Sequence, residues 1–143
     1  MTPEEIFKQL PYKEPFLFVD ELQKISEDQV VGSYLFQESA FFYQGHFKDY
    51  PVTPGVILTE CMAQIGLVCL GIFLIKGPFT SGFSAAMTHS DIEFFHPVFP
   101  GERVVVQSEK VYFRFNKLKC KARMLNSEGK IVAAGSISGM FKS

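Results

Sequence analysis

One short segment of this chain brings together residue types that could move protons at a carbon atom beside a carbonyl group. His46 lies in an irregular stretch between a glycine and a phenylalanine, and Glu60 follows it by fourteen positions. A neutral imidazole accepts a proton near neutral pH, and a carboxyl group whose pKa is raised by burial can donate one. The two side chains could therefore serve as the base and the acid of an elimination reaction.

Between these two residues, Pro54 and Gly55 predict the start of a helix. In one arrangement Thr53 is the cap and Pro54 is the first helical residue. The amides of Gly55 and Val56 are then left without partners inside the helix and carry the positive end of its dipole. Because Gly55 has no side chain, a substrate carbonyl oxygen could approach its N–H group and be stabilised as an enolate-like oxyanion. The alternative is a Pro-Gly turn that binds no ligand.

Glu60 and Gln64 are four positions apart and therefore share one face of the predicted helix. Glu60 is the single charged residue between Val56 and Ile75, and a carboxyl group in an enclosed helix is costly unless it has a partner or a function. Burial would raise its pKa towards a value at which it can donate a proton. Gln64 could hold the carboxyl group in position. The alternative is a carboxyl group that is hydrogen-bonded only for structure.

The other histidines and the cysteines give weaker signals. We expect His89 in a turn and His96 in a strand, and neither has a carboxylate at a telling spacing. An isolated histidine is more often structural than catalytic, which applies to His46 as well when it is taken alone. The three cysteines show no metal-binding spacing and follow no apolar leader, which predicts free thiols in a reducing compartment such as the cytoplasm. They are Cys61, Cys69 and Cys120.

Composition predicts a single globular domain over residues 1–143, with 47% hydrophobic and 20% charged residues. The net charge of −1 excludes a globally basic nucleic-acid binder. The segment from Arg103 to Arg123 is nevertheless basic, and it could either dock an acidic partner or form the solvated side of a strand. Sixteen phenylalanines and no tryptophan suit a dry core or a tunnel for an aliphatic ligand, and we expect most of them in the core.

The stretch from Val56 to Ile75 is long enough to span a bilayer. Glu60 would be costly in lipid, and no polybasic flank is present. We therefore expect a helix that is enclosed by protein, and no membrane partner.

The remaining segments predict one short helix and an antiparallel sheet. Thr2 can cap the helix, which we expect to extend to Leu10. Period-2 alternation and short turns predict antiparallel strands, so the fold class is α+β, with five or six strands curled around one buried helix. The expected strands are Phe16–Ile25, Gln29–Phe36, Ile92–Phe99, Arg103–Phe115, Leu118–Met124 and Lys130–Phe141.

Three phrases of the sequence resemble the 3-hydroxyacyl-acyl-carrier-protein dehydratase family of bacterial fatty acid synthesis. The first is Leu10-Pro11-Tyr12-Lys13-Glu14-Pro15-Phe16-Leu17-Phe18-Val19-Asp20. The second and most specific joins Gly45-His46-Phe47, Pro51-Val52-Thr53-Pro54-Gly55-Val56 and the helical run Glu60 to Gln64. The third is a weaker echo, Phe95-His96-Pro97-Val98-Phe99-Pro100-Gly101-Glu102.

The resemblance implies a hotdog fold and an obligate homodimer, and it leaves open whether three dimers associate. It implies dehydration of a (3R)-3-hydroxyacyl group on acyl carrier protein to the trans-2-enoyl product, without cofactor or metal. His46 of one subunit would be the base and Glu60 of the partner subunit the acid. Gly55 N–H would bind the thioester oxygen, and Gln64 would orient Glu60.

The sequence departs from the family at three positions, where Lys48 replaces a proline, Tyr50 a common arginine and Tyr12 a histidine. These changes leave the expected acid, base and oxyanion donor in place and bear on substrate preference and carrier docking. They are compatible with a specialised member serving a polyene or aryl lipid pathway. Two alternatives are an acyl thioesterase on the same fold and a non-catalytic acyl-binding or scaffold subunit.

Overall fold

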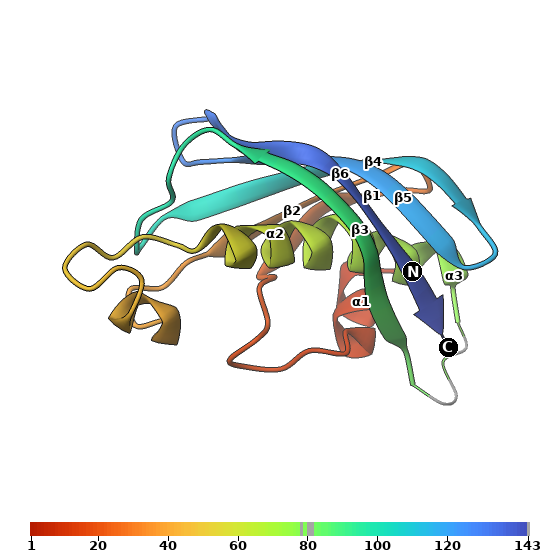
Figure 1. Ribbon diagram of the computed structural model, residues 1–143. Coiled ribbons are helices and arrows are strands. Elements are labelled where there is room, and N and C mark those ends of the chain that lie inside the picture. Colours follow the sequence, from red (N-terminus) through yellow and green to blue (C-terminus); the bar gives the residue numbers. More distant parts are fainter. Residues whose placement is uncertain (78, 80–81, 143) are drawn as a thin grey trace.

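The computed structural model describes residues 1–77, 79 and 82–142, which form a curved antiparallel sheet around a central helical segment (Figure 1). The order of the six strands is β1-β2-β4-β5-β6-β3. Their bounds are β1 Glu21–Ile25, β2 Gln29–Leu35, β3 Ser84–Phe94, β4 Arg103–Arg114, β5 Lys117–Leu125 and β6 Ile131–Lys142. This α+β arrangement, with the sheet curled around one helix, confirms the predicted hotdog fold.

The central helical segment has three parts, which are α2 (Gly55–Ala63), a π-helical stretch η2 (Gln64–Cys69) and α3 (Leu70–Ile75). All six residues of η2 are buried, and Lys76 ends the segment in the left-handed conformation. The segment is long and apolar enough to cross a membrane, but 72% of its most apolar window is buried inside the fold. The sheet and the segment therefore share one hydrophobic core.

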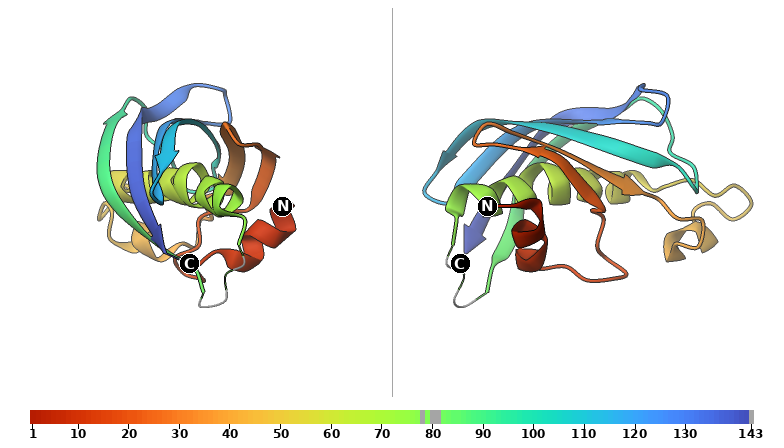
Figure 2. Two further views of the ribbon diagram at one scale, coloured as in Figure 1. Left: turned by 90° about the vertical axis from the view of Figure 1, so that its right-hand side faces the viewer. Right: turned by 180° about the vertical axis from the view of Figure 1, so that it is seen from behind.

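The N-terminal helix α1 (Pro3–Gln9) lies on the side of the central segment that the sheet leaves open (Figures 1 and 2). As predicted, Thr2 is its cap, and the side chain of Thr2 accepts a hydrogen bond from the Glu5 amide. Ile6 anchors the helix in the core. A short 3₁₀ helix, η1 (Phe41–Gln44), and the loop after it project beyond the sheet at the end where α2 begins (Figure 1).

The alternation of buried and exposed residues explains which strand faces touch the helix. Along β5, Leu118, Cys120, Ala122 and Met124 are buried, as the sequence pattern predicts. On β4 the period-2 pattern predicts one apolar face with Val105, Val111, Phe113 and Phe115. This prediction was wrong, because Val104 and Val106 are the buried valines and Val111 and Phe115 are exposed. A bulge between Lys110 and Tyr112 shifts the register, and a single period-2 pattern cannot follow such a shift.

Two of the predicted strands were wrong in extent. The strand expected over Ile92–Phe99 is β3, Ser84–Phe94, so His89 lies in a strand and His96 in a bend after it. Among the described residues the strand pairs on one side only, with β6, and its residues are mostly exposed, so it lacks an apolar pattern. The strand expected from Phe16 begins only at Glu21, although Phe18 and Val19 are buried.

Candidate active site

His46 lies in the loop between η1 and α2, where the backbone holds it at two points. Its amide donates to Phe42 O at 3.1 Å, and its carbonyl oxygen accepts from the Val52 amide at 2.9 Å. The ring atom Nδ1 lies 2.9 Å from Val52 O. A carbonyl oxygen only accepts, so Nδ1 carries the proton and, in the neutral ring, Nε2 is the unprotonated atom. The loop therefore presents a half-buried imidazole whose Nε2 can accept a proton.

The start of α2 differs by one residue from the predicted arrangement. Pro54 is the cap and Gly55 is the first helical residue, and the Thr53 side chain bonds the Tyr43 hydroxyl instead of capping the helix. The carbonyl oxygen of Pro54 accepts hydrogen bonds from the amides of Ile57 and Leu58. Among the residues that the structure describes, the amides of Gly55 and Val56 have no hydrogen-bond partner. The two expected donors are therefore free at the positive end of the helix.

A side chain at position 55 would crowd an aromatic neighbour. A Cβ atom built on Gly55 would lie 3.3 Å from Cζ of Phe94, at the end of β3. This ring is 49% exposed, so it covers the helix start from one side and remains open on the other. The free amides of α2 thus lie beside an accessible aromatic surface.

Glu60 and Gln64 are joined as the spacing predicts, since Gln64 Nε2 donates to Glu60 Oε2 at 2.9 Å. The same amide nitrogen donates to Phe16 O at 3.1 Å, and Gln64 Oε1 accepts from the Phe18 amide at 2.8 Å. Gln64 is fully buried, so these bonds fix which end of its amide faces the carboxyl group. Burial raises the pKa of Glu60 above its ordinary value, and the hydrogen bond from Gln64 offsets part of that rise.

Tyr12 is a neighbour of this carboxyl group that the sequence alone does not reveal. Burial raises the pKa of its phenol, and electrostatic interactions with the nearby Glu60 and Cys69 raise it further. The phenol therefore stays neutral around neutral pH. Residues 10–20, the first phrase that resembles the dehydratase family, thus lie near Glu60 of the second phrase. Gln64 causes this proximity, because it ties residues 16–18 to the central helical segment.

Within one chain, the structure shows no contact between His46 and Glu60 among the hydrogen bonds and ion pairs of the described residues. His46 belongs to the projecting loop, and Glu60 lies in the second turn of α2. The structure thus joins Glu60 to Gln64 and places the free amide of Gly55 at the helix start, but a single chain does not pair the expected base with the expected acid.

Large apolar side chains lie exposed around the helix start and along β3. Val56 is 77% exposed and Phe47 is 56% exposed, and Met87 and Phe94 are also exposed. We call these four residues the exposed apolar surface. Monomeric proteins rarely expose contiguous apolar patches beyond a few hundred Å², and larger patches mark interaction sites.

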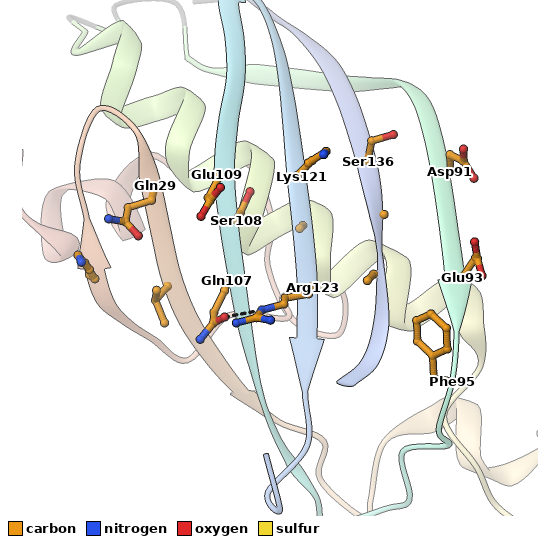
Figure 3. A pocket seen from close by; sticks show the side chains of 15 residues that line it. Gln29, Asp91, Glu93, Phe95, Gln107, Ser108, Glu109, Lys121, Arg123 and Ser136 are labelled. Carbon is orange, nitrogen blue, oxygen red and sulfur yellow. Dashed lines mark hydrogen bonds between the residues drawn. The ribbon is translucent and has the colours of Figure 1, made fainter. Parts of the chain in front are cut away.

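A hollow of about 960 Å³ lies elsewhere (Figure 3). It is open and polar, and it lies on the face of the sheet away from the helix. Its lining includes Asp91 and Glu93 on β3, and Lys121 and Arg123 on β5, and Arg123 Nε donates to Gln107 Oε1 at 2.7 Å. None of the expected site residues lines it, so the size of a hollow in one chain does not locate the candidate site.

The cysteines offer no alternative nucleophile. All three are free and buried, and burial raises the pKa of each thiol, to about 12 for Cys69 and to about 11 for Cys120. A thiol that stays protonated is a poor nucleophile. Over the described part of the chain, no group of histidine, cysteine and carboxylate side chains could hold a metal ion.

Comparison with known proteins agrees with the resemblance read from the sequence. The 3-hydroxyacyl-[acyl-carrier-protein] dehydratase FabZ of Clostridium perfringens is 35% identical over 140 residues, which cover 96% of each chain. The protein of the same name from Petrotoga mobilis is 31% identical, and the match covers 100% of both chains.

Two solved structures support the fold. The dehydratase heterocomplex ApeI:P from Xenorhabdus doucetiae matches 100% of this chain and 93% of that chain, with a TM-score of 0.80 and 11% identity. A hypothetical thioesterase with coenzyme A from Streptococcus pneumoniae matches 86% of this chain and 85% of that chain, with a TM-score of 0.65 and 18% identity. A family model described as a FabA-like domain matches residues 10–137, and with the curated relatives it shows that the chain belongs to this family.

Proposed function

We propose that the chain is a hydro-lyase that dehydrates (3R)-3-hydroxyacyl groups on acyl carrier protein to trans-2-enoyl groups, in fatty acid or related lipid synthesis. The curated relatives that match almost the whole chain carry the name of this activity. The observation in the structure that supports it most is the carboxyl group of Glu60, whose pKa is raised by burial and whose position is held by Gln64. A carboxyl group of this kind can donate a proton to a departing hydroxyl group.

In the proposed reaction, Nε2 of His46 removes a proton from C2 of the acyl group. The electron pair moves towards the thioester carbonyl oxygen, where Gly55 N–H stabilises the developing charge. As the double bond forms between C2 and C3, the C3–O bond breaks. Glu60 gives its proton to the departing hydroxyl group, which leaves as water. The imidazolium and the carboxylate then exchange a proton with solvent and return to their starting states.

The site requires two chains, with His46 of one subunit facing Glu60 of the partner subunit. Three observations support a homodimer. In the part of one chain that the structure describes, no hydrogen bond or ion pair joins His46 to Glu60, the exposed apolar surface adjoins Gly55, and one edge of β3 is unpaired. A second copy could cover the apolar surface and the strand edge at once. This homodimer is also compatible with the association of three such dimers.

The elimination needs a base and an acid and involves no net oxidation or reduction, so His46 and Glu60 suffice for it and no cofactor or metal is needed. The partner is an acyl carrier protein bearing the 3-hydroxyacyl thioester. Three free, buried cysteines fit a cytoplasmic protein.

Two substitutions test the assignment. His46→Ala and Glu60→Gln should each abolish conversion of a 3-hydroxyacyl-carrier substrate, and the reverse hydration of the enoyl substrate, while the dimer remains intact. Mass spectrometry of the carrier-bound acyl group measures both directions. Near-wild-type turnover by either variant would contradict the assignment.

A thioesterase remains the second candidate, because free amides at a helix start and one carboxyl group could also serve thioester hydrolysis. In that reaction His46 would have no clear task. Release of free carrier thiol, measured with a thiol reagent in the same assay, would favour it. Binding of acyl groups without any turnover would instead favour a non-catalytic acyl-binding subunit.

A further inference from the structure

The aromatic ring next to the proposed base contacts it directly. The rings of His46 and Phe47 are stacked, with centroids 4.0 Å apart and an interplanar angle of 27°. Phe47 is nevertheless 56% exposed. Within one chain, a phenylalanine with more than half of its surface outside the core adds little to that core, so packing in its own chain does not account for its place, whether or not a second copy covers the exposed side.

The stacking completes the orientation of the imidazole. The hydrogen bond from Nδ1 to Val52 O holds one atom of the ring, but the ring can still turn about that bond. A second flat ring against its face blocks this rotation, because turning would drive the imidazole into the phenyl group. With both contacts in place, Nε2 points in one direction.

The phenyl ring is itself held by a tight turn. The Phe47 amide donates to Tyr50 O at 2.9 Å, and the Tyr50 amide donates back to Phe47 O at 3.2 Å. The Tyr50 ring in turn meets the Phe99 ring edge-on, with centroids 5.9 Å apart. The turn therefore connects the loop that bears the base to the segment after β3.

We propose that Phe47 is a positioning residue for the base. Its ring holds the imidazole of His46 in the orientation in which Nε2 meets the C2 proton of the substrate. This inference rests on the proposed function of His46. Misplacing a reacting group by about 1 Å can cost about 100-fold in rate. An enzyme whose imidazole is loosely held should therefore have a lower kcat, with its affinity for substrate unchanged.

Three variants separate aromatic stacking from apolar packing. Phe47→Leu keeps an apolar side chain but removes the flat ring, and Phe47→Tyr keeps the ring. Phe41→Leu is the matched control, because Phe41 is also an exposed phenylalanine, at 53%, but contacts Phe42 rather than His46. We expect Phe47→Leu to lower kcat about 10- to 100-fold with little change in KM, while Phe47→Tyr and Phe41→Leu stay near wild type.

A spectroscopic measurement tests the stacking without any assay of activity. In proton NMR of the dimer, the phenyl ring of Phe47 should displace the chemical shifts of the His46 ring protons. These resonances are assigned by their disappearance in His46→Ala. Phe47→Leu should remove this displacement, and Phe41→Leu should not. If Phe47→Leu fails to fold, the wild-type and Phe47→Tyr proteins still test the stacking, because absence of the displacement from either spectrum overturns it.

The values of kcat and the NMR displacement together decide the role of Phe47. Loss of kcat in Phe47→Leu together with loss of the displacement supports the proposal. Wild-type kcat in Phe47→Leu, an equal loss in Phe47→Tyr, or no displacement in the wild-type protein overturns it. Full activity of His46→Ala would instead overturn the proposed function, whatever the NMR spectrum shows.

Discussion

The side-chain amide of Gln64 donates a hydrogen bond to Glu60 over 2.9 Å and also ties residues 16–18 to the central helical segment. One buried side chain therefore orients the proposed acid and anchors the segment that covers it. The position of the carboxyl group and the stability of the fold thus depend on the same residue.

Replacing Gln64 by leucine should lower both stability and activity. The change leaves the Phe18 amide and the Phe16 carbonyl without their partner, and each unsatisfied buried group costs about 1–3 kcal/mol. Urea unfolding measures the loss of stability, and turnover per folded dimer measures the loss of activity. The control is Gln107→Leu, because among the hydrogen bonds of the described residues the side chain of Gln107 bonds only the exposed Arg123 side chain. Equal stability of the Gln64 and Gln107 variants would contradict the anchoring role.

Glu60 should make the stability of the protein depend on pH. Burial raises its pKa in the folded chain above the value in the unfolded chain, so folding favours the protonated form. Its contribution to stability is fully present below the unfolded pKa and is lost as the pH rises through the raised folded pKa. Glu60→Gln cannot ionise, so it should become more stable than wild type as the pH rises from about 4 to about 8.

Thermal unfolding of both proteins over that pH range measures the difference. If the Tm of Glu60→Gln exceeds that of wild type by more as the pH rises, the result agrees with the raised pKa of Glu60. A difference that grows as the pH falls contradicts it.

The pH dependence of turnover should also depend on Glu60, since the proposed acid must hold its proton. Turnover should therefore fall on the alkaline side, and Gln64→Ala should move that fall to higher pH, because the hydrogen bond from Gln64 lowers the pKa.

Gly55→Ala should reduce turnover more than stability. The new methyl group would lie 3.3 Å from the Phe94 ring, which is half exposed and can move aside, so the cost in stability should be small. The same methyl group should hinder the approach of the substrate carbonyl oxygen to the Gly55 amide. Alanine keeps the N–H group, so the loss in kcat should not exceed the about 100- to 1000-fold that removal of an oxyanion donor costs. The double variant with Phe94→Leu relieves the crowding. Recovery of full activity in that variant would show that crowding of Phe94, and not access to the amide, caused the loss.

Val56→Lys should separate the proposed dimer into monomers. Val56 is 77% exposed at the helix start, and a lysine there would place an unpaired charge in the contact between two subunits. Sedimentation velocity measures the change, which should be accompanied by loss of turnover. Val111→Lys is the control, because Val111 is also exposed but lies on β4, outside the exposed apolar surface. A Val56→Lys protein that remains a dimer would contradict this interface.

Local sequence patterns predicted some of these features correctly and others incorrectly. The Thr2 cap and the bond between Glu60 and Gln64 follow from spacings of three and four residues, and both were confirmed. The cap expected at Thr53 was wrong, because its hydroxyl bonds Tyr43 ten residues away. Such a partner depends on the folded loop, which no local pattern encodes.

Features that depend on distant segments could not be read from the sequence. The approach of Tyr12 to Glu60 is set by a hydrogen bond across 46 residues, from Phe18 to Gln64. The strand β3 was misplaced because an edge strand whose residues are mostly exposed carries no apolar alternation. The meeting of base and acid is a property of two chains, so neither the sequence pattern nor the fold of one chain tests it.

Mixed dimers test the central claim most directly. When His46→Ala and Glu60→Gln chains are combined, a dimer with one chain of each kind keeps one site in which both groups are intact, provided that they come from different subunits. Random pairing of equal amounts should then recover about a quarter of wild-type turnover from two inactive variants. If the mixture stays inactive although mixed dimers are isolated with two affinity tags, the base and the acid do not act across the two subunits.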